Sequence, residues 1–229
     1  LRRALRDLKV AKARNEELVR VTYQAAYDSF VANPRPAVIR PKADKRRARG
    51  EVALWHLTDW QGAKRTTSYD SEIMRARVHQ FIDKAERITE IQRADHPVRS
   101  VTILFGGDML EGLFNYPTQA FEIDATLFDQ WTRVSQLLIE VVERALATHD
   151  EVTVFAEWGN HGRIGSKRDA VPRSDNLDRM CYETARMALA SEPRLRWEDS
   201  PEDIQKVEIG NYRALLLHGD EPAEQIVGG

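Results

Sequence analysis

The chain has 229 residues, of which 42% are hydrophobic and 31% are charged, so it can bury a core and does not have the composition of a disordered protein. Its single cysteine, Cys181, excludes an internal disulfide framework and a cysteine-rich zinc site. No apolar stretch reaches the roughly 20 residues that a bilayer span needs, and the basic start lacks the apolar centre of a secretory signal. We therefore expect a cytoplasmic protein that has no membrane partner.

The charge is distributed unevenly along the chain. Residues 1–50 contain 14 Lys and Arg against 5 Asp and Glu, whereas residues 51–229 contain 20 against 31. A basic segment attached to an acidic body favours contact with a polyanion such as nucleic acid. A solvated basic helix with a flexible linker would give the same charge pattern, and the composition leaves both alternatives open.

The first fifty residues are predicted to form a basic helix and a linker. Residues 2–30 contain neither Gly nor Pro and carry a thin apolar stripe, which predicts a helix that packs on the body, on a partner or on a second copy in a homodimer. Residues 33–50 contain three prolines among many basic residues and are predicted to be extended. The predicted units are thus a helix at 1–32, a linker at 33–50 and one domain at 51–229.

From residue 51 onward, strand and helix patterns alternate. Segments with the composition of strands are 51–58, 100–105, 151–156, 195–198, 206–210 and 212–218. Segments with apolar residues at helical spacing are 71–93, about 122–148 and 174–190, the last with Ser174 or Asp175 as its N-cap. This order predicts an α/β fold whose central sheet is parallel at first and has helices on both faces.

Four of the predicted strands end in polar residues beside glycine. The four sequences are Thr58-Asp59-Trp60-Gln61-Gly62, Gly106-Gly107-Asp108, Gly159-Asn160-His161-Gly162 and Leu217-His218-Gly219-Asp220. In open α/β sheets, ligands bind beyond the carboxyl ends of the strands, so we expect these side chains to meet at one edge. Glycine at these points lets the backbone turn sharply and lets a ligand approach closely.

The residue types at these strand ends indicate a metal site. Clustered carboxylates repel one another unless a cation holds them, and carboxylate, amide and imidazole ligands suit hard or borderline divalent ions. The set is too large for one ion, so we expect two divalent metal ions. Two metals roughly 3.5–4 Å apart stabilise both the attacking and the leaving oxygen of a phosphoryl displacement.

The ordered motifs D-x-[H/Q], GGD, GNH and HG resemble those of the calcineurin-like metallophosphoesterases, over about residues 51–220. The resemblance implies a two-sheet β-sandwich flanked by helices, an αββα arrangement, preceded here by the N-terminal helix. It also implies dinuclear-metal-dependent hydrolysis of phosphate esters. The departures from the family pattern resemble DNA-repair exonuclease and phage-type members.

The resemblance also assigns roles to individual residues. Asp59 and Gln61 would ligate one metal, Asp108 would bridge the two metals, and Asn160 and His218 would ligate the second. His161 would serve as the catalytic general acid, or would stabilise the leaving oxygen electrostatically.

Two departures concern the metals. Gln61 stands where the family has His, and its weaker amide ligand favours Mn²⁺ or Mg²⁺ over zinc, with Mn²⁺ expected. The family's G-H-x-H motif does not follow His218 within the 229 residues. We therefore expect a continuation beyond residue 229 that carries two further histidines.

A third departure concerns His161. Gly162 replaces the acid that usually follows GNH, so Glu157, Asp169 or Asp175 would have to orient the imidazole. Glu111, three residues after Asp108, would either support the metal site or lie in solvent.

The loop after GNH is basic. Arg163, Lys167 and Arg168 would attract a phosphate backbone, although a solvated loop has the same composition. With the basic N-terminal segment, this loop favours nucleic acid as the substrate and predicts a DNA nuclease. A small-substrate phosphatase or cyclic-nucleotide phosphodiesterase would use the same metals. A non-catalytic scaffold subunit is the alternative that Gln61 and the missing tail motif favour.

Overall fold

The computed structural model describes Gln24, Asp28, Ala32 and residues 35–113, 118–164, 172–199 and 204–220. Most of the predicted N-terminal helix therefore lies outside the described residues, and so do the predicted homodimer and partner contacts of residues 2–30. Within the described parts of the chain, none of the helices is long and apolar enough to cross a membrane.

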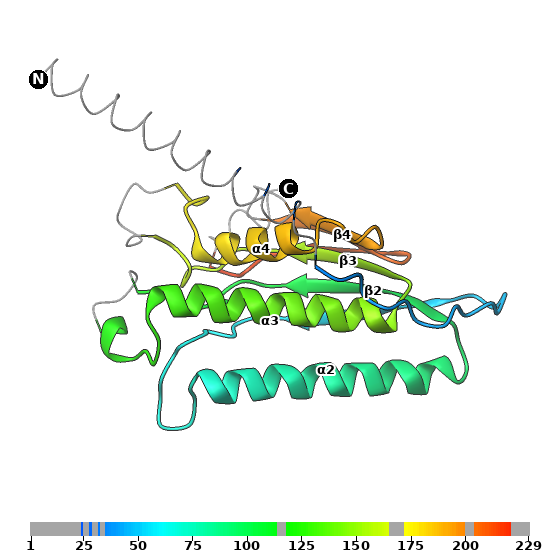
Figure 1. The fold of residues 1–229 in the computed structure, drawn as a ribbon, viewed down its shortest axis with the longest axis horizontal. Helices are drawn as coiled ribbons and strands as arrows, with labels where there is room; N and C mark the ends of the chain where they lie inside the picture. The colour runs from blue at the N-terminus through cyan, green and yellow to red at the C-terminus, as the bar shows by residue number, and fades with distance from the viewer. Residues whose placement is uncertain are drawn as a thin grey trace, which may run out of the picture.

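Four parallel strands form the central sheet in the order β1-β2-β3-β4 (Figure 1). The strands are β1 (Glu51–Leu57), β2 (Val98–Phe105), β3 (Glu151–Ala156) and β4 (Leu195–Asp199). The helices that connect them in turn are α2 (Ser71–Arg93), α3 (Leu127–Thr148) and α4 (Leu177–Ala188). Parallel neighbours need a long crossover, which each helix provides. The predicted α/β class and the parallel start of the sheet are confirmed.

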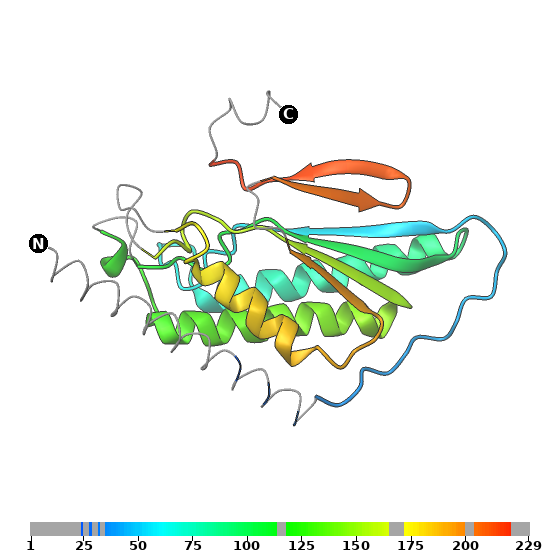
Figure 2. The same ribbon diagram turned by 90° about the horizontal axis from the view of Figure 1, so that it is seen from above.

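The helices cover one face of the sheet, and a β-hairpin lies on the other face (Figure 2). The hairpin consists of β5 (Gln205–Ile209) and β6 (Tyr212–Leu216), paired antiparallel. Successive residues of a strand point to opposite faces, so Ile103 and Phe105 enter the core under the helices, whereas Leu104 packs against Val207 and Leu216 of the hairpin.

This arrangement corrects one expectation and leaves another open. In the described residues, helices do not cover both faces, because the segment after β4 forms strands that cover the second face. The small antiparallel sheet faces the parallel sheet, but two strands do not make the full β-sandwich that the family resemblance implies. That sandwich stays a prediction.

Two helices begin later than predicted, and in both cases the cap explains the difference. Thr126 caps α3, since its side chain accepts the N–H of Asp129 and donates to the Asp129 carboxylate at 2.6 Å. Asn176 caps α4 in place of Ser174 or Asp175, because its side-chain oxygen accepts the N–H of Asp178 at 2.8 Å. A short 3₁₀ helix, η1 (Gln119–Phe121), precedes α3.

The linker at residues 35–50 is extended, as predicted, and arginines fasten it to the body. Arg46 pairs with Asp44 at 2.7 Å and donates to the carbonyls of Arg93 and His96 at the end of α2. In the other direction, Arg99 of β2 donates to the carbonyls of Asp44 and Arg46. The linker thus lies across the end of the sheet where the strands begin.

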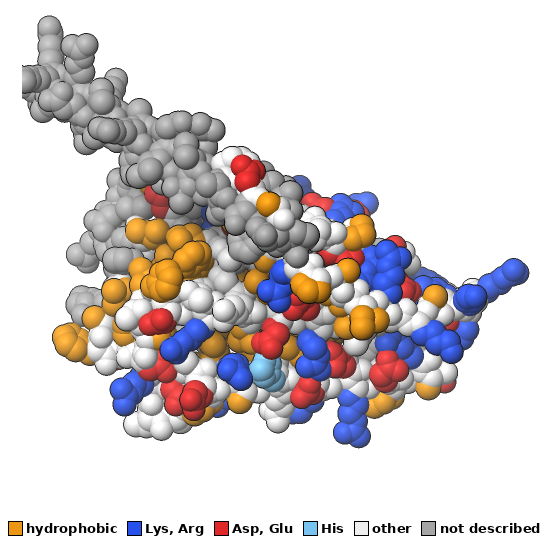
Figure 3. Space-filling view, in the orientation of Figure 1, with side chains coloured by type: hydrophobic (Ala, Val, Ile, Leu, Met, Phe, Trp, Pro, Cys, Tyr) orange, Lys and Arg blue, Asp and Glu red, His pale blue; other side chains and the backbone are white. Residues whose placement is uncertain are grey.

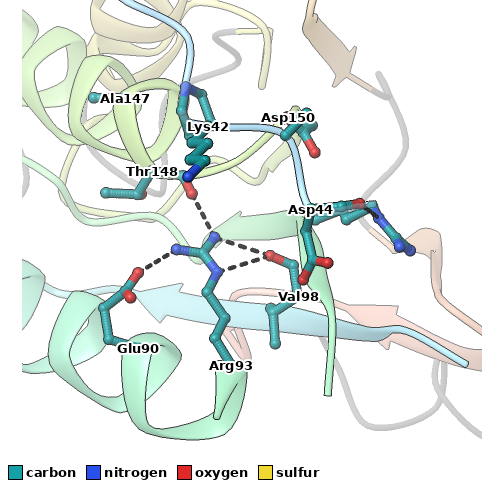
Figure 4. Close-up of a pocket in the computed structure, with 11 residues that line it drawn as sticks. Lys42, Asp44, Glu90, Arg93, Val98, Ala147, Thr148 and Asp150 are labelled. Carbon is teal, nitrogen blue, oxygen red and sulfur yellow. Dashed lines mark hydrogen bonds and ion pairs between the residues drawn. The ribbon is translucent and has the colours of Figure 1, made fainter. Parts of the chain in front are cut away.

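Arg93 occupies the centre of that end, beside a pocket of about 400 Å³ (Figure 4). Its guanidinium donates to the carbonyls of Val98 and Thr148 and pairs with Glu90. The last carbonyls of a helix have no partner within the helix, so the bonds from Arg93 to Thr148 and from Arg46 to Arg93 satisfy groups that helix geometry leaves open. Figure 3 shows Lys and Arg side chains gathered toward this end of the molecule, with acidic side chains between them.

Candidate metal centre

The loops that follow β1 and β2 run side by side beyond the ends of their strands. The N–H of Asp59 donates to the carbonyl of Gly107 at 3.0 Å, and that of Gln61 donates to the carbonyl of Asp108 at 2.8 Å. The parallel pairing of the two strands therefore continues into the loops. This continuation brings the two predicted aspartate ligands to the same point.

The backbone of these loops is strained where it presents the ligands. Asp59, Gln61 and Asp108 have φ angles of 55°, 44° and 54°, in the left-handed region. That region costs roughly 1–2 kcal/mol for a residue with a side chain, although Asp tolerates it better than most. Such strain persists only where the surrounding structure enforces it, and it is typical of functional sites.

Close packing between the ligand loops requires glycine at two positions. A Cβ at Gly159 would lie 2.0 Å from Oδ1 of Asp108, and a Cβ at Gly107, whose φ is 92°, would lie 2.5 Å from the N of Gly159. Any side chain at either position would separate the loops. Glycine here permits the close approach of two loops of the chain, while the predicted close approach of a ligand stays a prediction.

Four of the five predicted ligands meet at this edge of the sheet. Asp59, Asp108 and His218 each offer a ligand atom, and these atoms all lie within 4.8 Å of one another. The Nε2 atom of His218 lies 3.2 Å from Oδ2 of Asp108 and 3.1 Å from Oδ1 of Asn160. Three loops distant in sequence, together with the second residue after β6, thus converge on one cluster.

The surroundings of His218 show how its ring faces the cluster. Its Nδ1 lies 2.7 Å from the carbonyl oxygen of Gly106, so Nδ1 carries a hydrogen and Nε2 faces the oxygens of Asp108 and Asn160. Burial opposes a charge on the ring, but the hydrogen bond to Asp108 and its negative charge outweigh burial and raise the pKa of His218 to about 9. With a proton on Nε2 the ring donates to these oxygens; without that proton, Nε2 and the oxygens form a donor set that fits a divalent cation.

Gln61 contributes mainly through its backbone. Its N–H and carbonyl bond to Asp108 and Lys64, and its side chain lines a pocket together with Asp59. Its role as a metal ligand stays a prediction.

His161 lies beside the cluster and is oriented by an acid other than those expected. Its backbone N–H donates to Oδ1 of Asp108 at 2.7 Å, and its Nδ1 lies 3.1 Å from Oε2 of Glu111, which is buried. Glu111, against the opposing effect of burial, raises the pKa of His161, and the charge of Asp108 adds to this. Lys64, which the sequence did not single out, places its Nζ 3.6 Å from the same Glu111 oxygen.

Of the three acids expected to orient His161, the two that the structure describes, Glu157 and Asp175, do not contact its ring. Glu157 is buried and pairs with Arg173 at 2.7 Å, and burial raises the pKa of Glu157. Asp175 is exposed, and Asp169 lies outside the described residues. Glu111 takes this position because the loop after β2 packs closely against His161. A Cβ added at Gly112 would lie 2.2 Å from the carbonyl oxygen of His161.

Asp178 is the most important residue that the sequence did not single out. Its fully buried carboxylate accepts the N–H groups of Asp108 at 2.8 Å, Met109 at 3.0 Å and Gly159 at 2.8 Å. Burial and the charge of Asp108 raise the pKa of Asp178 to about 6. Asn176 donates a hydrogen bond of 2.8 Å to the carbonyl of Gly159. The start of α4 therefore connects the loop after β2, which carries Asp108, to the loop after β3, which carries Asn160.

The basic loop is described only in part. Arg163 pairs with Asp220 at 2.6 Å, so its charge is matched by an acid two residues after His218. Lys167 and Arg168 lie outside the described residues. The assignment of these three residues as phosphate contacts stays a prediction.

Comparison with models of known protein families and with curated proteins finds no match to this chain.

Proposed function

We propose that the chain is a divalent-metal-dependent phosphoesterase. The observation that carries the proposal is the convergence of Asp59, Asp108, Asn160 and His218, whose oxygen and nitrogen atoms face one another, with both aspartates on left-handed backbone. Carboxylate, amide and imidazole side chains that share one point form a ligand set that suits a divalent cation. The same residues carry the resemblance to the calcineurin-like metallophosphoesterases, whose two-sheet sandwich we propose for the complete domain.

In this proposal Asp59, Asp108, Asn160 and His218 bind the cation, and His161 donates a proton. Bound there, the cation would polarise a phosphoryl oxygen and lower the pKa of a water molecule, as divalent metals do in hydrolases. Asp178 holds Asp108 in place, since its carboxylate accepts the N–H groups of Asp108, Met109 and Gly159 from two neighbouring loops. A second cation, held by Asp59 and Gln61 and bridged by Asp108, and the preference for Mn²⁺ remain part of the proposal.

His161 suits the role of general acid. A carboxylate at Nδ1 stabilises the imidazolium, so the ring keeps a proton that it can donate to a leaving oxygen. Glu111 thereby positions His161, and Lys64, which contacts the same carboxylate, adds a positive charge next to the acid.

Replacement of Asp108 tests the proposal. Asp108→Asn keeps the shape of the side chain but removes the charge, so it is expected to abolish Mn²⁺-dependent hydrolysis of bis-p-nitrophenyl phosphate. His161→Ala is expected to lower the rate by about 10²–10³ while Mn²⁺ binding, measured by calorimetry, persists. Glu183→Gln, which changes an acid of α4 that pairs with Arg186, is the control. Hydrolysis by the Asp108 variant at the wild-type rate would reject the metal site.

We further propose nucleic acid, and DNA above all, as the substrate. The support is the basic linker, in which Lys45, Arg47 and Arg49 are exposed. Removal of one cation that neutralises a phosphate should reduce the slope of log affinity against log salt by about 0.9. The triple variant Lys45→Gln, Arg47→Gln, Arg49→Gln should therefore lower that slope by about 2–3 for duplex DNA.

The matched control for the linker is Arg35→Gln. Arg35 also belongs to the linker, but its guanidinium pairs with Glu143 at 2.8 Å, so its replacement should change the slope little. An unchanged slope in the triple variant would remove the linker from DNA binding. Digestion of linear and circular DNA by the wild type, with Asp108→Asn alongside, separates a nuclease from a phosphatase of small substrates.

A further inference from the structure

A second cavity adjoins the candidate metal centre. It has a volume of about 450 Å³ and lies between the end of β1, the loop after it and α2. This volume falls in the range of about 300–1,000 Å³ that is usual for small-molecule sites. Two of the predicted metal ligands, Asp59 and Gln61, line it, so the cavity adjoins the candidate metal centre.

The lining divides into an apolar floor and a cationic rim. The floor consists of Trp60, Met74 and Val78, all buried. The rim carries Lys64 and Arg77. Asp59 is the one acid among the described lining residues, and a bound cation would neutralise it. The lining therefore fits a ligand that combines an apolar or aromatic group with negative charge.

At the rim, the Arg77 guanidinium lies over one face of the Tyr69 ring, and the two side chains form a stacked platform. The Arg77 guanidinium lies 5.2 Å from the centre of the Tyr69 ring, and the Tyr69 hydroxyl donates to the carbonyl of Trp60 at 2.5 Å. The ring is half-buried and fixed by this bond, while the arginine is exposed. Aromatic rings and guanidinium planes are the surfaces on which nucleobases stack.

Lys64 connects the cavity to the site. It lines the cavity, and its Nζ lies 3.6 Å from the Glu111 oxygen that contacts His161. A phosphate next to Lys64 would thus lie between the platform and the general acid.

We infer that this cavity binds one nucleotide of the substrate, with the base against Tyr69 and Arg77 and a phosphate against Lys64. The inference rests on the proposed phosphoesterase function and deepens it, since it names a nucleotide next to the hydrolysed phosphate as the recognised group. Stacking accepts every base, so the preference is for nucleotides as a class.

Calorimetric titration of the full chain with three probes tests the inference. Thymidine 5′-monophosphate should bind at least about tenfold more tightly than either thymidine or inorganic phosphate, because only the nucleotide fills both parts of the cavity. Arg77→Gln and Lys64→Gln should each weaken nucleotide binding about tenfold, because each removes a positive charge that faces the nucleotide. Arg75→Gln, an exposed arginine on the same helix that does not line the cavity, should bind as the wild type does.

The outcomes separate the inference from the function beneath it. Equal binding of the nucleotide and inorganic phosphate, or equal losses in the Arg75 and Arg77 variants, would overturn the nucleotide site. Bis-p-nitrophenyl phosphate contains no nucleoside, so its hydrolysis reports the proposed function alone. Nucleotide binding by a chain that hydrolyses no phosphodiester would overturn the function and leave the nucleotide site standing.

Discussion

The two ends of the parallel sheet differ in how their polar groups are satisfied. Where the strands begin, the guanidinium groups of Arg46 and Arg93 meet backbone carbonyls and acids, so donors and acceptors are matched within the protein. Where the strands end, Asp59, Asp108 and His218 offer ligand atoms within 4.8 Å of one another, and the two aspartates lie on left-handed backbone. The first end adds to stability, whereas left-handed backbone at the second end costs stability and is typical of functional sites.

Asp178 offers the strongest test of this difference. Asp178→Ala removes the acceptor of three buried N–H groups, so the free energy of unfolding should fall by about 3 kcal/mol or more. Because the ligand loops lose their common support, affinity for Mn²⁺ should also fall at least about tenfold. Urea unfolding and calorimetry measure the two effects.

Asp175→Ala is the control, since this exposed acid lies three residues earlier and should change stability by no more than about 0.5 kcal/mol. Wild-type Mn²⁺ affinity in the Asp178 variant would show that the loops hold their positions without it.

His149, at the end where the strands begin, should make that end sensitive to acid. Burial lowers the pKa of His149 from 6.5 to about 4, and its Nε2 has no hydrogen-bond partner among the described residues. Between these two pH values the unfolded chain binds a proton that the folded chain does not, so stability falls as the pH drops. The loss between pH 7 and pH 4 should be about 3 kcal/mol.

Comparison of the wild type with His149→Phe tests whether His149 causes this loss of stability in acid. The ring packs edge-on against Trp55 at 5.8 Å, a contact that Phe can keep, while the titrating group is removed. Urea unfolding across the pH range should show a smaller acid loss in the variant. The same loss in both proteins would assign the acid sensitivity to other groups.

Replacement of Arg93 should change the free energy of unfolding least among these three tests, and it contrasts most clearly with replacement of Asp178. Arg93→Met keeps the apolar stem but leaves the carbonyls of Val98 and Thr148 without this donor, at a cost of about 2 kcal/mol. Affinity for Mn²⁺ should stay at the wild-type value because the site lies at the opposite end of the strands. Arg87→Ala, an exposed change on the same helix, serves as the control. A matching fall in Mn²⁺ affinity would mean that the two ends are coupled.

Local patterns explain what could be predicted from the sequence. The predicted helix at 71–93 and the predicted strand at 151–156 have the observed bounds, because their apolar spacing is continuous. The ligand cluster followed from one rule, that neighbouring parallel strands end at the same edge. Asp59, Asp108 and Asn160 meet for this reason, whereas His218 reaches the cluster from the end of β6 in the separate hairpin.

The remaining features depend on contacts between distant segments. Ser174, Asp175 and Asn176 are all good caps, and the bond from Asn176 to Gly159 identifies the one that is used. Asp178 had the sequence context of an ordinary acid in a first helical turn. Its role comes from the ligand loops packed against it, which no local pattern encodes.

The position of His218 just after the hairpin has a consequence for motion. β5 and β6 pair only with each other in the described sheets, and an isolated two-stranded hairpin is marginally stable in water. A bound cation would fasten the end of β6 to the loops of the parallel sheet and would oppose local opening. Amide hydrogen exchange in the hairpin should therefore slow when Mn²⁺ is added. A cation bound at one end of β6 would thus control how often the entire hairpin opens.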